Sequence, residues 1–355
     1  MAFLSLTVRY LINTEALNGV ENVGNISRHR VAPIVIPMDN SYTLKYMPVV
    51  SGESLAHGYQ SVLVDVAKSE SLPLGKRSSV KEFVKFADYK LLKEEEINPP
   101  KDATQIREVE TAIMLKDVVA DVGGFLYTGK AKSQRKRTSA KSSSEEVGAE
   151  ESSSEDEKNQ SLKRTSAFQV SYMIPAYGVS PEVAAVESQF HVRYSVDQQE
   201  YQKPYNVDVG SALYTFTFDL DMDVIATPVN QGNKAKGEDE LAGEKKKRQR
   251  AALLALARFL ENLEFGAKKS RFHPVVDFRD AVMTLTEKPF VVTPAVTNDY
   301  ADKTANRLKV LSDMKVVAVK KFMTVNVAPK SGYQAEQKDT IAEAINEVIK
   351  SLDLH

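Results

Sequence analysis

The sequence predicts an α+β fold, in which one sheet carries helices on a face and insertions interrupt the chain. Segments in which hydrophobic and polar residues alternate, as in half-buried strands, occur near the start and again after the middle. Segments with apolar residues at helical spacing lie between them and near the end. The resulting order is strand, helix, helix, strands, helix, strand, helix. A length of 355 residues allows two domains or one domain with large insertions.

The first part of the chain contains one predicted strand and two predicted helices. Residues 3–12 alternate with period two, which indicates a half-buried strand. Residues 13–37 are rich in Asn, Gly, Arg and His and are expected to form a loop. Ser51 is expected to be the N-cap of the first helix. A second helix is expected over residues 104–119, stopping at the glycine pair that follows.

Residues 130–166 form a predicted disordered, low-complexity insertion. Basic residues without any acid come first, and acidic residues interleaved with serine follow. This composition is typical of a solvated loop. A second polar segment, residues 229–243, is expected to be a flexible loop. Residues 1–129 and 167–355 are therefore expected to form the folded core together.

The second part of the chain returns to regular structure. Residues 186–196 alternate strictly, which predicts a strand with one apolar and one polar face, and residues 214–222 repeat the pattern. A helix is expected to open with the basic run at Lys245. Residues 310–322 predict a late strand, and residues 341–352 a closing amphipathic helix.

The composition excludes several classes of function. The 47 basic and 48 acidic residues give a net charge of −1, so any polyanion site must be a local patch. Cysteine is absent, which excludes disulfides, cysteine-liganded zinc, iron–sulfur clusters and a thiol nucleophile. We expect no secretory signal and no membrane span or membrane partner, and hence a soluble cytoplasmic protein.

No catalytic motif or cofactor fingerprint is found in the sequence. A phosphate loop and a dinucleotide-binding motif are missing, and the spacing of the five histidines fits no zinc pattern. Asp219, Asp221 and Asp223 alternate along a strand, but a solvated strand face is favoured over a cation site. The sequence therefore predicts no catalytic residue, no metal and no cofactor.

Two segments of the first part have the chemistry of anion binding. The loop 18–30 offers amide donors on Asn18, Asn22 and Asn25, and arginine forks suited to phosphate on Arg28 and Arg30. The helix start at Ser51 and Ser54 presents hydroxyls, unpaired N–H groups and the positive end of the helix dipole. Simple helix capping is the alternative there, and the nearby Glu53 counts against a bare phosphate pocket.

Two later segments are also polar or basic. The strand face with Gln189, His191 and Arg193 offers polar contacts and a ring for stacking; an edge strand facing water is the alternative. The loop 266–272 carries Lys268, Lys269 and Arg271, and could equally be an ordinary charged loop. Four such segments in a nearly neutral protein without a catalytic set favour a local groove that follows a nucleic-acid backbone.

Several runs of residues resemble an archaeal CRISPR-associated family. They lie in family order over most of the chain: 9–13, 15–18, 21–30, 48–55, 189–194 and 266–274. The runs within residues 9–55 are the most specific, and the two later runs are less so. The family is the backbone subunit of type I Cascade complexes, the DevR-like Cas-seven family of the repeat-associated mysterious protein superfamily. The insertion at 130–166 departs from the family pattern.

The resemblance implies a modified RNA-recognition, ferredoxin-like core with insertions that give a crescent. It implies a non-catalytic subunit that stacks head-to-tail along the CRISPR RNA, beside other Cascade subunits. The subunit would hold the guide backbone and leave base edges free to pair with target DNA. The RNA-binding residues implied are Asn18, Asn22, Asn25, Arg28, His29, Arg30, Ser51, Ser54, His57, Gln189, His191, Arg193, Lys268, Lys269 and Arg271.

Two other functions stay open at this level. A metal-independent CRISPR RNA-processing endoribonuclease would use His29, His57 or His191 as general acid or base near a phosphate. A scaffold that binds no nucleic acid would rest on the C-terminal helix and the charged tract. RNA that copurifies with the protein would distinguish the RNA-binding backbone subunit from the scaffold that binds no nucleic acid.

Overall fold

The computed structural model describes residues 1–355 except 129–160, 180–183, 194–202, 267–272 and 355. None of its described helices is long and apolar enough to cross a membrane. The helices are α1 (Gly52–Ser69), α2 (Tyr89–Glu94), α3 (Ile106–Lys116), α4 (Val118–Gly123), α5 (Glu238–Gly243), α6 (Lys245–Asn262), α7 (Tyr300–Asp313) and α8 (Ile341–Ser351). The strands are β1 (Phe3–Glu15), β2 (Gly19–Val23), β3 (Ile26–His29), β4 (Val31–Met38), β5 (Ser41–Pro48), β6 (Phe125–Thr128), β7 (Ser161–Arg164), β8 (Phe168–Val170), β9 (Ile174–Pro175), β10 (Ala185–Arg193), β11 (Lys203–Asp221), β12 (Val275–Thr286), β13 (Val319–Val325) and β14 (Glu336–Lys338).

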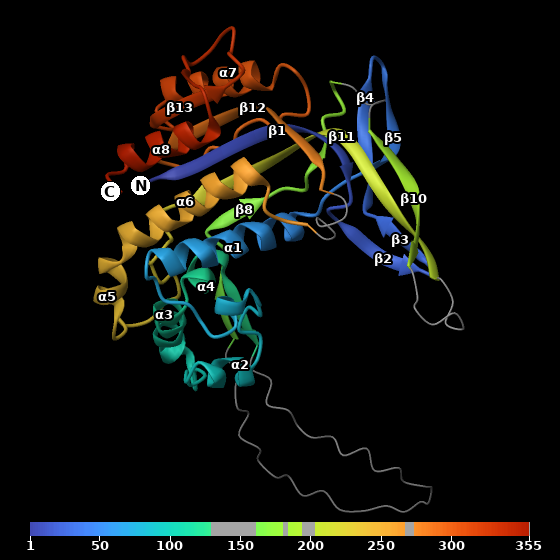
Figure 1. Ribbon diagram of the computed structural model, residues 1–355. Helices are drawn as coiled ribbons and strands as arrows, with labels where there is room; N and C mark the ends of the chain where they lie inside the picture. The colour runs from blue at the N-terminus through green and yellow to red at the C-terminus, as the bar shows by residue number, and fades with distance from the viewer. Residues whose placement is uncertain (129–160, 180–183, 194–202, 267–272, 355) are drawn as a thin grey trace, which may run out of the picture.

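Ten of these strands form the main sheet (Figure 1). Its path is β14-β13-β12-β1-β11-β3-β2, and β8, β9 and β10 also pair with β11. β1 lies between β11 and β12 and is antiparallel to both. β4 with β5 and β6 with β7 form two separate two-stranded ribbons. The first strand of the sequence is therefore a central strand of the sheet.

Helices α1 and α6 cover one face of the sheet. The apolar residues of β1 point into the main core on this side, where Tyr10 donates its hydroxyl to the carbonyl of Leu260 at 2.7 Å. Tyr59 of α1 likewise donates to the carbonyl of Ala252 at 3.1 Å. A tyrosine can be buried whole when its hydroxyl finds such a partner. The amphipathic helix α8 buries Ile345 and Val348 in the same core.

The other face of β1 is polar and is covered by the chain that follows β12. Ser5 accepts the N–H of Val292 at 3.0 Å, and Thr7 accepts that of Ala295 at 3.2 Å. Arg9 forms a nearly buried ion pair with Asp280 of β12, with 2.6 Å between nitrogen and oxygen. These bonds explain why a central strand alternates apolar with polar residues although both of its faces are buried. Helix α7 builds a second, smaller core nearby.

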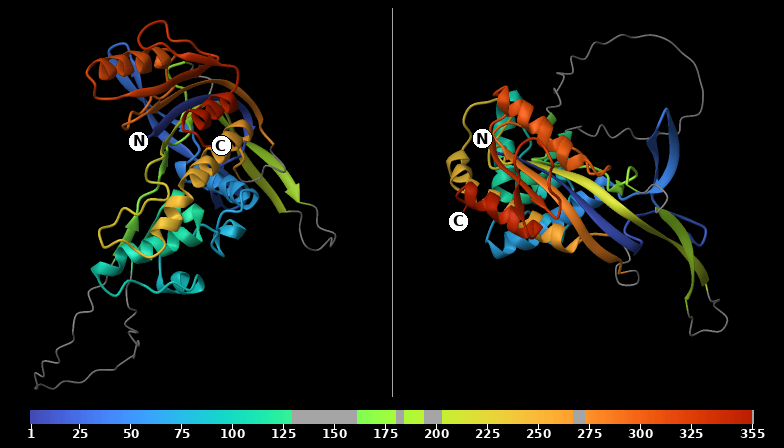
Figure 2. Two further views of the ribbon diagram at one scale, coloured as in Figure 1. Left: turned by 90° about the vertical axis from the view of Figure 1, so that its left-hand side faces the viewer. Right: turned by 90° about the horizontal axis from the view of Figure 1, so that it is seen from above.

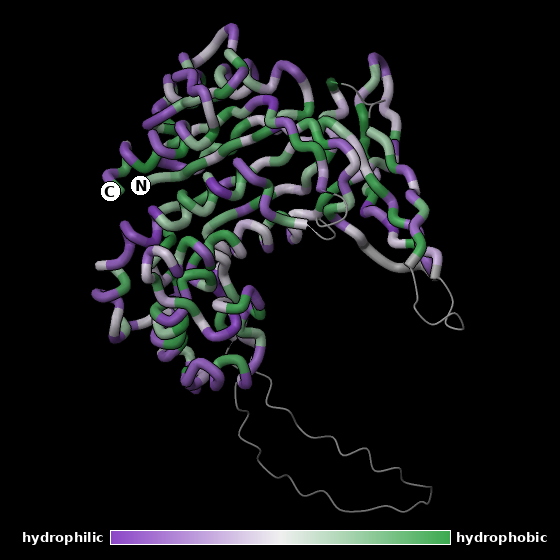
Figure 3. Tube along the Cα trace, in the orientation of Figure 1, coloured by the Kyte–Doolittle hydropathy of each residue, from purple (hydrophilic) through white to green (hydrophobic). Residues whose placement is uncertain are grey.

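One end of the sheet and a group of helices project from the core and give the described residues a crescent outline (Figures 1 and 3). Strands β2, β3 and β10 with the start of β11 form one arm, and the β4–β5 ribbon stands beside it. Helices α2, α3 and α4 with the β6–β7 ribbon form the other arm, which we call the helical arm. Figure 2 shows both arms from two further directions.

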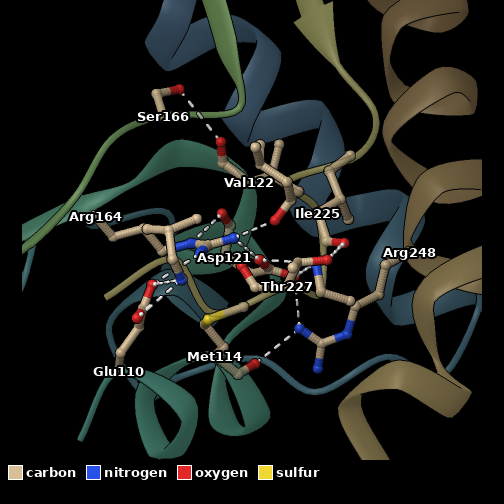
Figure 4. A network of polar contacts seen from close by, with 12 residues as sticks. Glu110, Met114, Asp121, Val122, Arg164, Ser166, Ile225, Thr227 and Arg248 are labelled. Carbon is tan, nitrogen blue, oxygen red and sulfur yellow. Dashed lines mark hydrogen bonds and ion pairs between the residues drawn. The ribbon is translucent and has the colours of Figure 1, made fainter. Parts of the chain in front are cut away.

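A buried charge network joins the helical arm to the core (Figure 4). Arg164 of β7 pairs with Asp121 of α4 at 2.6 Å and with Glu110 of α3 at 3.0 Å. Arg248 of α6 reaches the same Asp121 at 3.0 Å. Charges buried this deeply cost much free energy unless each one is paired and hydrogen-bonded, as these are. The network therefore fixes the arm against α6.

The structure confirms several predicted elements. β1 covers the predicted first strand and runs on to Glu15, and α6 and α8 begin within the predicted segments. Helix α1 begins where expected, and the Ser51 hydroxyl oxygen accepts the N–H of Ser54 at 3.3 Å as its N-cap. These elements have strong hydrophobic periodicity and a clear start signal.

Three predicted elements were wrong in part. Residues 13–37 are not a loop, because β2, β3 and most of β4 lie there; Gly24 supplies the left-handed turn between β2 and β3. The helix over 104–119 is two helices, since the Asp117 side chain accepts the N–H of Val119 at 2.9 Å and caps α4. The late strand at 310–322 begins only at Val319, after α7 has ended.

The predicted flexible segments also need correction. Residues 130–160 of the insertion lie outside the described residues, but its end at 161–166 includes β7 with the buried Arg164. Residues 229–243 include α5, and Glu238 pairs with Arg107 at 2.6 Å. Asp219 is buried rather than on a solvated face. Ion pairs of Arg164 and Glu238 with residues distant in the sequence hold the two polar segments in place. Such pairs leave no local pattern in a sequence.

Candidate nucleic-acid interface

Asn18, Arg30 and Ser51 meet at the N-terminus of α1. The carbonyl of Asn18 accepts the N–H of Arg30 at 3.0 Å, and the Asn18 side-chain oxygen accepts the N–H of Ser51 at 2.9 Å. The carbonyl of Arg30 in turn accepts the N–H of Val49 at 3.0 Å. The polar loop and the helix start, which are far apart in the sequence, therefore form one site. We call Asn18, Arg30, Ser51 and Ser54 the junction.

The basic loop begins beside the junction. Gly266 has φ of 102°, and a Cβ on it would lie 2.6 Å from a methyl carbon of Leu17. A Cβ on Gly58 of α1 would lie 2.4 Å from that of Phe265. Only glycine permits such approaches. The chain therefore enters residues 267–272 from beside Leu17, although Lys268, Lys269 and Arg271 themselves lie outside the described residues.

The start of α1 is partly covered. A Cβ on Gly52 would lie 2.8 Å from the carbonyl oxygen of Val170, so the end of β8 packs closely on the first helical residue. Ser51 is buried, Ser54 is half-buried and Glu53 is exposed. The end of β8 therefore covers one side of the helix start, and a ligand must approach the junction from another side.

A buried ion pair lies next to the junction and holds it in position. The Nε2 of His29 contacts the Glu15 carboxylate, and both side chains have no exposed surface. Tyr214 donates its hydroxyl to the same carboxylate at 2.8 Å, and the N–H of Leu17 donates to it at 2.7 Å. The residue next to Leu17 is Asn18, so Glu15 links β1, β3 and β11 to the junction.

Geometry and electrostatics agree that His29 is an imidazolium. Its Nδ1 lies 2.8 Å from the carbonyl oxygen of Arg30, and its Nε2 faces the Glu15 carboxylate. Both partners only accept, so both ring nitrogens donate. Burial alone would lower the pKa of His29, but the hydrogen bond and charge of Glu15, with the Arg30 carbonyl and the charge of Asp208, together outweigh burial and raise it. Burial would raise the pKa of Glu15, but the hydrogen bond and charge of His29, with the hydrogen bonds from Leu17 and Tyr214, together lower it.

Gly210 provides the space for this ion pair. It lies opposite Glu15 in the register of β1 and β11. A Cβ there would lie 2.7 Å from a Glu15 oxygen, 3.0 Å from the Tyr214 hydroxyl and 3.1 Å from the His29 Nε2. A side chain at this position would push the three groups apart. Glycine inside a strand thus marks a close approach.

The arm formed by β2, β3, β10 and the start of β11 carries an exposed face with aromatic, amide and basic side chains. Asn206 of β11 lies opposite Phe190 of β10 and opposite Ile26 of β3, so these three side chains share one face. Arg28 follows Ile26 at the strand period and lies on the same face. Phe190 is 67% exposed, and Arg28 is exposed as well. We call this set of Phe190, Asn206, Ile26 and Arg28 the arm face.

The structure separates the expected RNA-binding residues into three groups. Asn18, His29 and Ser51 are buried and bonded within the protein, so their observed role is to position the junction. The exposed or half-buried group contains Asn25, Arg28, Arg30, Ser54, His57 and Gln189. The side chains of Asn22 and Arg193 lie outside the described part, although their strands are described.

The strand face expected to meet RNA is exposed at Glu187 and Gln189. His191 is half-buried and stacks on Tyr205 of β11, with ring centroids 5.3 Å apart. The apolar residues expected to be buried, Val186, Phe190 and Val192, are exposed instead. The period of β10 was therefore predicted correctly, but the expected burial of its apolar face was wrong, because both faces of the strand are largely exposed.

His57 contacts the segment between α1 and α2 rather than the junction. Its ring meets the ring of Phe83 edge-on, with centroids 5.0 Å apart, and its Nδ1 lies 3.4 Å from the Ser61 hydroxyl. Among the residues that the structure describes, no three His, Asp or Glu side chains gather to hold a metal ion.

Sequence reasoning missed Glu15, Gly210, Tyr214 and Phe190. A glycine inside an alternating strand was the available signal for Gly210. No signal marked Phe190, because its place in the apolar alternation predicted burial. Glu15 and Tyr214 become recognisable only when the register of β1 on β11 is known.

Comparison with known proteins identifies the family. The fold and the site define a class of α+β protein. In this class, amide, hydroxyl and arginine side chains lie together where an extension of the sheet meets the N-terminus of a helix. A family model described as "CRISPR-associated negative auto-regulator DevR/Csa2" matches residues 6–305. The chain belongs to this DevR/Csa2 family of CRISPR-associated proteins, which confirms the resemblance seen in the sequence.

Relatives with this kind of description cover most of the chain. "CRISPR-associated aCascade subunit Cas7/Csa2 2" of Saccharolobus solfataricus is 40% identical over 351 residues, 99% of each chain. "CRISPR-associated protein Cas7/Csa2 1" of the same organism is 33% identical and covers 84% of this chain and 83% of its own. A solved "CRISPR RNA-guided surveillance complex" contains a chain that is 10% identical, with 99% of both chains covered and a TM-score of 0.47.

Proposed function

We propose that the protein is a non-catalytic CRISPR RNA-binding backbone subunit of an archaeal Cascade interference complex in antiviral defence. It polymerises along the guide RNA and presents the guide for pairing with target DNA. The relative named an aCascade subunit, 40% identical along 99% of each chain, supports the assignment to this complex. The observation that carries RNA binding is the hydrogen bond from Ser51 to Asn18, which unites the polar loop with the helix start.

The junction suits the sugar–phosphate backbone rather than the bases. Arg30 is half-buried, and its Nε has no hydrogen-bond partner among the described residues. A buried donor of this kind calls for an acceptor, and phosphate oxygens match a guanidinium well. Ser54 and the N–H groups at the start of α1 add donors on the same side. Such contacts position the RNA backbone without recognising the base sequence. Sequence specificity then comes from base pairing of the guide with its target.

The arm face extends this grip. Arg28 offers a second guanidinium, and the exposed Phe190 ring offers a surface for stacking on a base or ribose. Asn206 lies between them in the register and adds an amide. Lys268, Lys269 and Arg271 remain proposed RNA-binding residues, because their loop starts from Gly266 beside the junction.

The core is proposed to be ferredoxin-like. β1, α1, β8, β11, α6 and β12 follow each other in the order β-α-β-β-α-β, with further elements inserted. Their four strands lie side by side as β12, β1, β11, β8, all antiparallel, with both helices on one face. Residues 1–129 and 167–355, with β7 added, form this core and its inserted subdomains.

The remaining partners follow from this assignment. Copies of the subunit associate head-to-tail on the RNA in the cytoplasm, and other Cascade subunits complete the complex. A heterologous contact between identical chains need not close, so an open helix results. The net charge of −1 allows such stacking, because strongly basic subunits would repel one another.

The histidines do not favour the RNA-processing alternative. His29 is buried, and both of its ring nitrogens are engaged by Glu15 and by the carbonyl of Arg30. His57 faces Phe83, and His191 stacks on Tyr205. A general acid or base must reach the proton it transfers, and His29 reaches only groups of its own chain.

Purification and RNA incubation test the proposal. The protein is expected to copurify with RNA, to bind single-stranded RNA of any sequence with similar affinity, and to form longer assemblies on longer RNA. Size-exclusion chromatography with guides of several lengths measures this directly. Absence of RNA-dependent assembly would contradict the proposal. Cleavage of a repeat-containing RNA by the purified protein, lost in His57→Ala, would support the processing alternative instead.

A further inference from the structure

The β4–β5 ribbon carries one wholly uncharged, apolar face. The register pairs Val31 with Pro48, Pro33 with Tyr46, Val35 with Leu44, and Pro37 with Tyr42, so these eight side chains share a face. Seven of the eight are exposed: Tyr42 78%, Tyr46 71%, Val35 56%, Leu44 55% and Val31 48%, with Pro33 and Pro37. We call these eight residues the ribbon face. Exposed apolar patches of this kind mark interaction sites.

The opposite face of the ribbon is held by the protein. Ile36 and Met47 are buried there, at 4% and 3% exposure, while Lys45 is exposed on the same side. The ribbon is therefore anchored through one face and presents the other. This arrangement fixes the exposed tyrosines on a positioned strand pair, and rigid aromatic side chains of this type dominate protein interfaces.

The outer edge of β4 is blocked against strand addition. Pro33 and Pro37 lack an N–H group and lie four residues apart, so their nitrogens point to the same side of β4. Proline is tolerated inside a paired strand where its nitrogen points away from the partner strand. Another strand could not hydrogen-bond along this edge without losing two donors. A partner must therefore dock on the ribbon face and not on the ribbon edge.

The chemistry of the ribbon face favours a protein over a nucleic-acid backbone as its partner. None of its eight residues carries a charge, whereas phosphate binding depends on Lys and Arg. The ribbon nevertheless emerges from the junction itself, since Val31 follows Arg30 and Pro48 comes three residues before Ser51. A protein that covers the ribbon face thus stands at the border of the proposed RNA site.

We infer that the ribbon face is the surface through which one copy of this chain docks on the next copy along the RNA. The inference rests on the proposed function and names one side of the head-to-tail contact. RNA that leaves the junction of one copy must pass directly to the next, which requires protein contact at the border of the junction. The ribbon is placed there, and an apolar contact between nearly neutral chains costs little repulsion.

Paired variants on the two faces of one strand test the inference. Leu44→Ser with Tyr46→Ser changes the ribbon face, and Lys45→Ser between them changes the opposite face as the control. All three side chains are exposed, so each variant is expected to keep its thermal unfolding midpoint. The ribbon-face variant is expected to bind a short RNA that holds one copy as tightly as the unmodified protein does. On a longer RNA it is expected to lose cooperative assembly by about tenfold per tyrosine or leucine removed.

The outcomes separate this inference from the proposed function. If the unmodified protein binds no RNA, the proposed function fails. If the unmodified protein binds and assembles, and the ribbon-face variant assembles equally well, the inference fails while RNA binding stands. In that case the ribbon face contacts a different subunit, or none. Loss of assembly in the ribbon-face variant but not in Lys45→Ser supports docking of a second copy.

Discussion

The side-chain oxygen of Asn18 accepts the N–H of Ser51 at 2.9 Å, and both residues are buried. Asn18 follows β1 and Ser51 caps α1, so one amide fixes the helix start against the central strand. The ribbon β4–β5 lies between these residues in the sequence and closes on itself. Removing the amide would therefore affect the proposed RNA site without touching any exposed cation.

Replacing Asn18 with alanine should destabilise the protein. The buried N–H of Ser51 would lose its acceptor, which costs about 1–3 kcal/mol of unfolding free energy. Urea unfolding measures the loss. Asn25→Ala is the matched control: Asn25 is an exposed asparagine in the turn between β2 and β3, and its change should stay within about 0.5 kcal/mol. Equal effects of the two substitutions would contradict the role of the Asn18 amide.

The Glu15–His29 pair should make stability depend on pH in two directions. The pKa of His29 is raised, so its contribution is complete below its ordinary pKa of 6.5 and is lost as pH rises through the raised value. The pKa of Glu15 is lowered, so its contribution is complete above 4.5 and is lost as pH falls through the lowered value. The pair therefore stabilises most between the two ordinary values.

The substitution Glu15→Gln tests this pH dependence. It leaves His29 buried without its counter-charge and should cost roughly 3–5 kcal/mol of unfolding free energy near pH 6. The difference from the unmodified protein should shrink above the raised pKa of His29. Glu53→Gln, at an exposed acid in the first turn of α1, serves as the control. A penalty for Glu15→Gln that is constant across pH would refute the ion pair.

Gly210→Ala should disturb the contacts among Glu15, His29 and Tyr214, because the added methyl group needs space that these side chains occupy. The added methyl would lie 2.7 Å from a Glu15 oxygen and 3.1 Å from the His29 ring, so at least one group must move. Overpacking of a buried site costs typically about 1–3 kcal/mol. Gly243→Ala is the matched control, because its methyl would meet nothing within 4 Å. Thermal unfolding of both variants decides; a neutral Gly210→Ala would show that the cluster tolerates expansion.

Local signals in the sequence predicted the elements that begin the site. The alternation in β1 and the N-cap Ser51 are local features, and both were predicted correctly. The loop 18–30 was recognised as polar but not as the strands β2 and β3. The proline-rich alternation of β4 also concealed a strand, because proline is normally depleted in strands.

The supporting interactions could not be predicted, because they join distant residues. Glu15 contacts His29 and Tyr214 only once β1, β3 and β11 lie side by side. The exposure of Phe190 depends on which face of β10 the rest of the arm covers, and alternation alone does not determine this. A residue pattern thus gives the period of a strand, whereas the choice of buried face is a property of the tertiary structure.

Arg164→Ala should destabilise the helical arm. Glu110 and Asp121 would lose the guanidinium that lies 3.0 Å and 2.6 Å away, and Arg248 would be the one ion-pair partner that Asp121 keeps among the described residues. Breaking a buried pair from one side costs roughly 3–5 kcal/mol. Lys163→Ala is the control, since Lys163 is the exposed neighbour on the same strand. Hydrogen exchange of α3 and α4 should accelerate in Arg164→Ala; unchanged exchange there would contradict a structural role for the network.

Arg28→Ala should weaken RNA binding without changing stability. Arg28 is exposed on the arm face, so its loss removes a cation and little packing. If it contacts one phosphate, binding of all RNA sequences should weaken similarly, and the slope of log affinity against log salt should fall by about 0.7 for a single strand. Lys309→Ala on α7 provides the control, an exposed cation on an element outside the proposed RNA site. Fluorescence anisotropy at several salt concentrations measures both variants. If the two slopes change equally, Arg28 acts through general charge, and the arm face does not bind the RNA backbone.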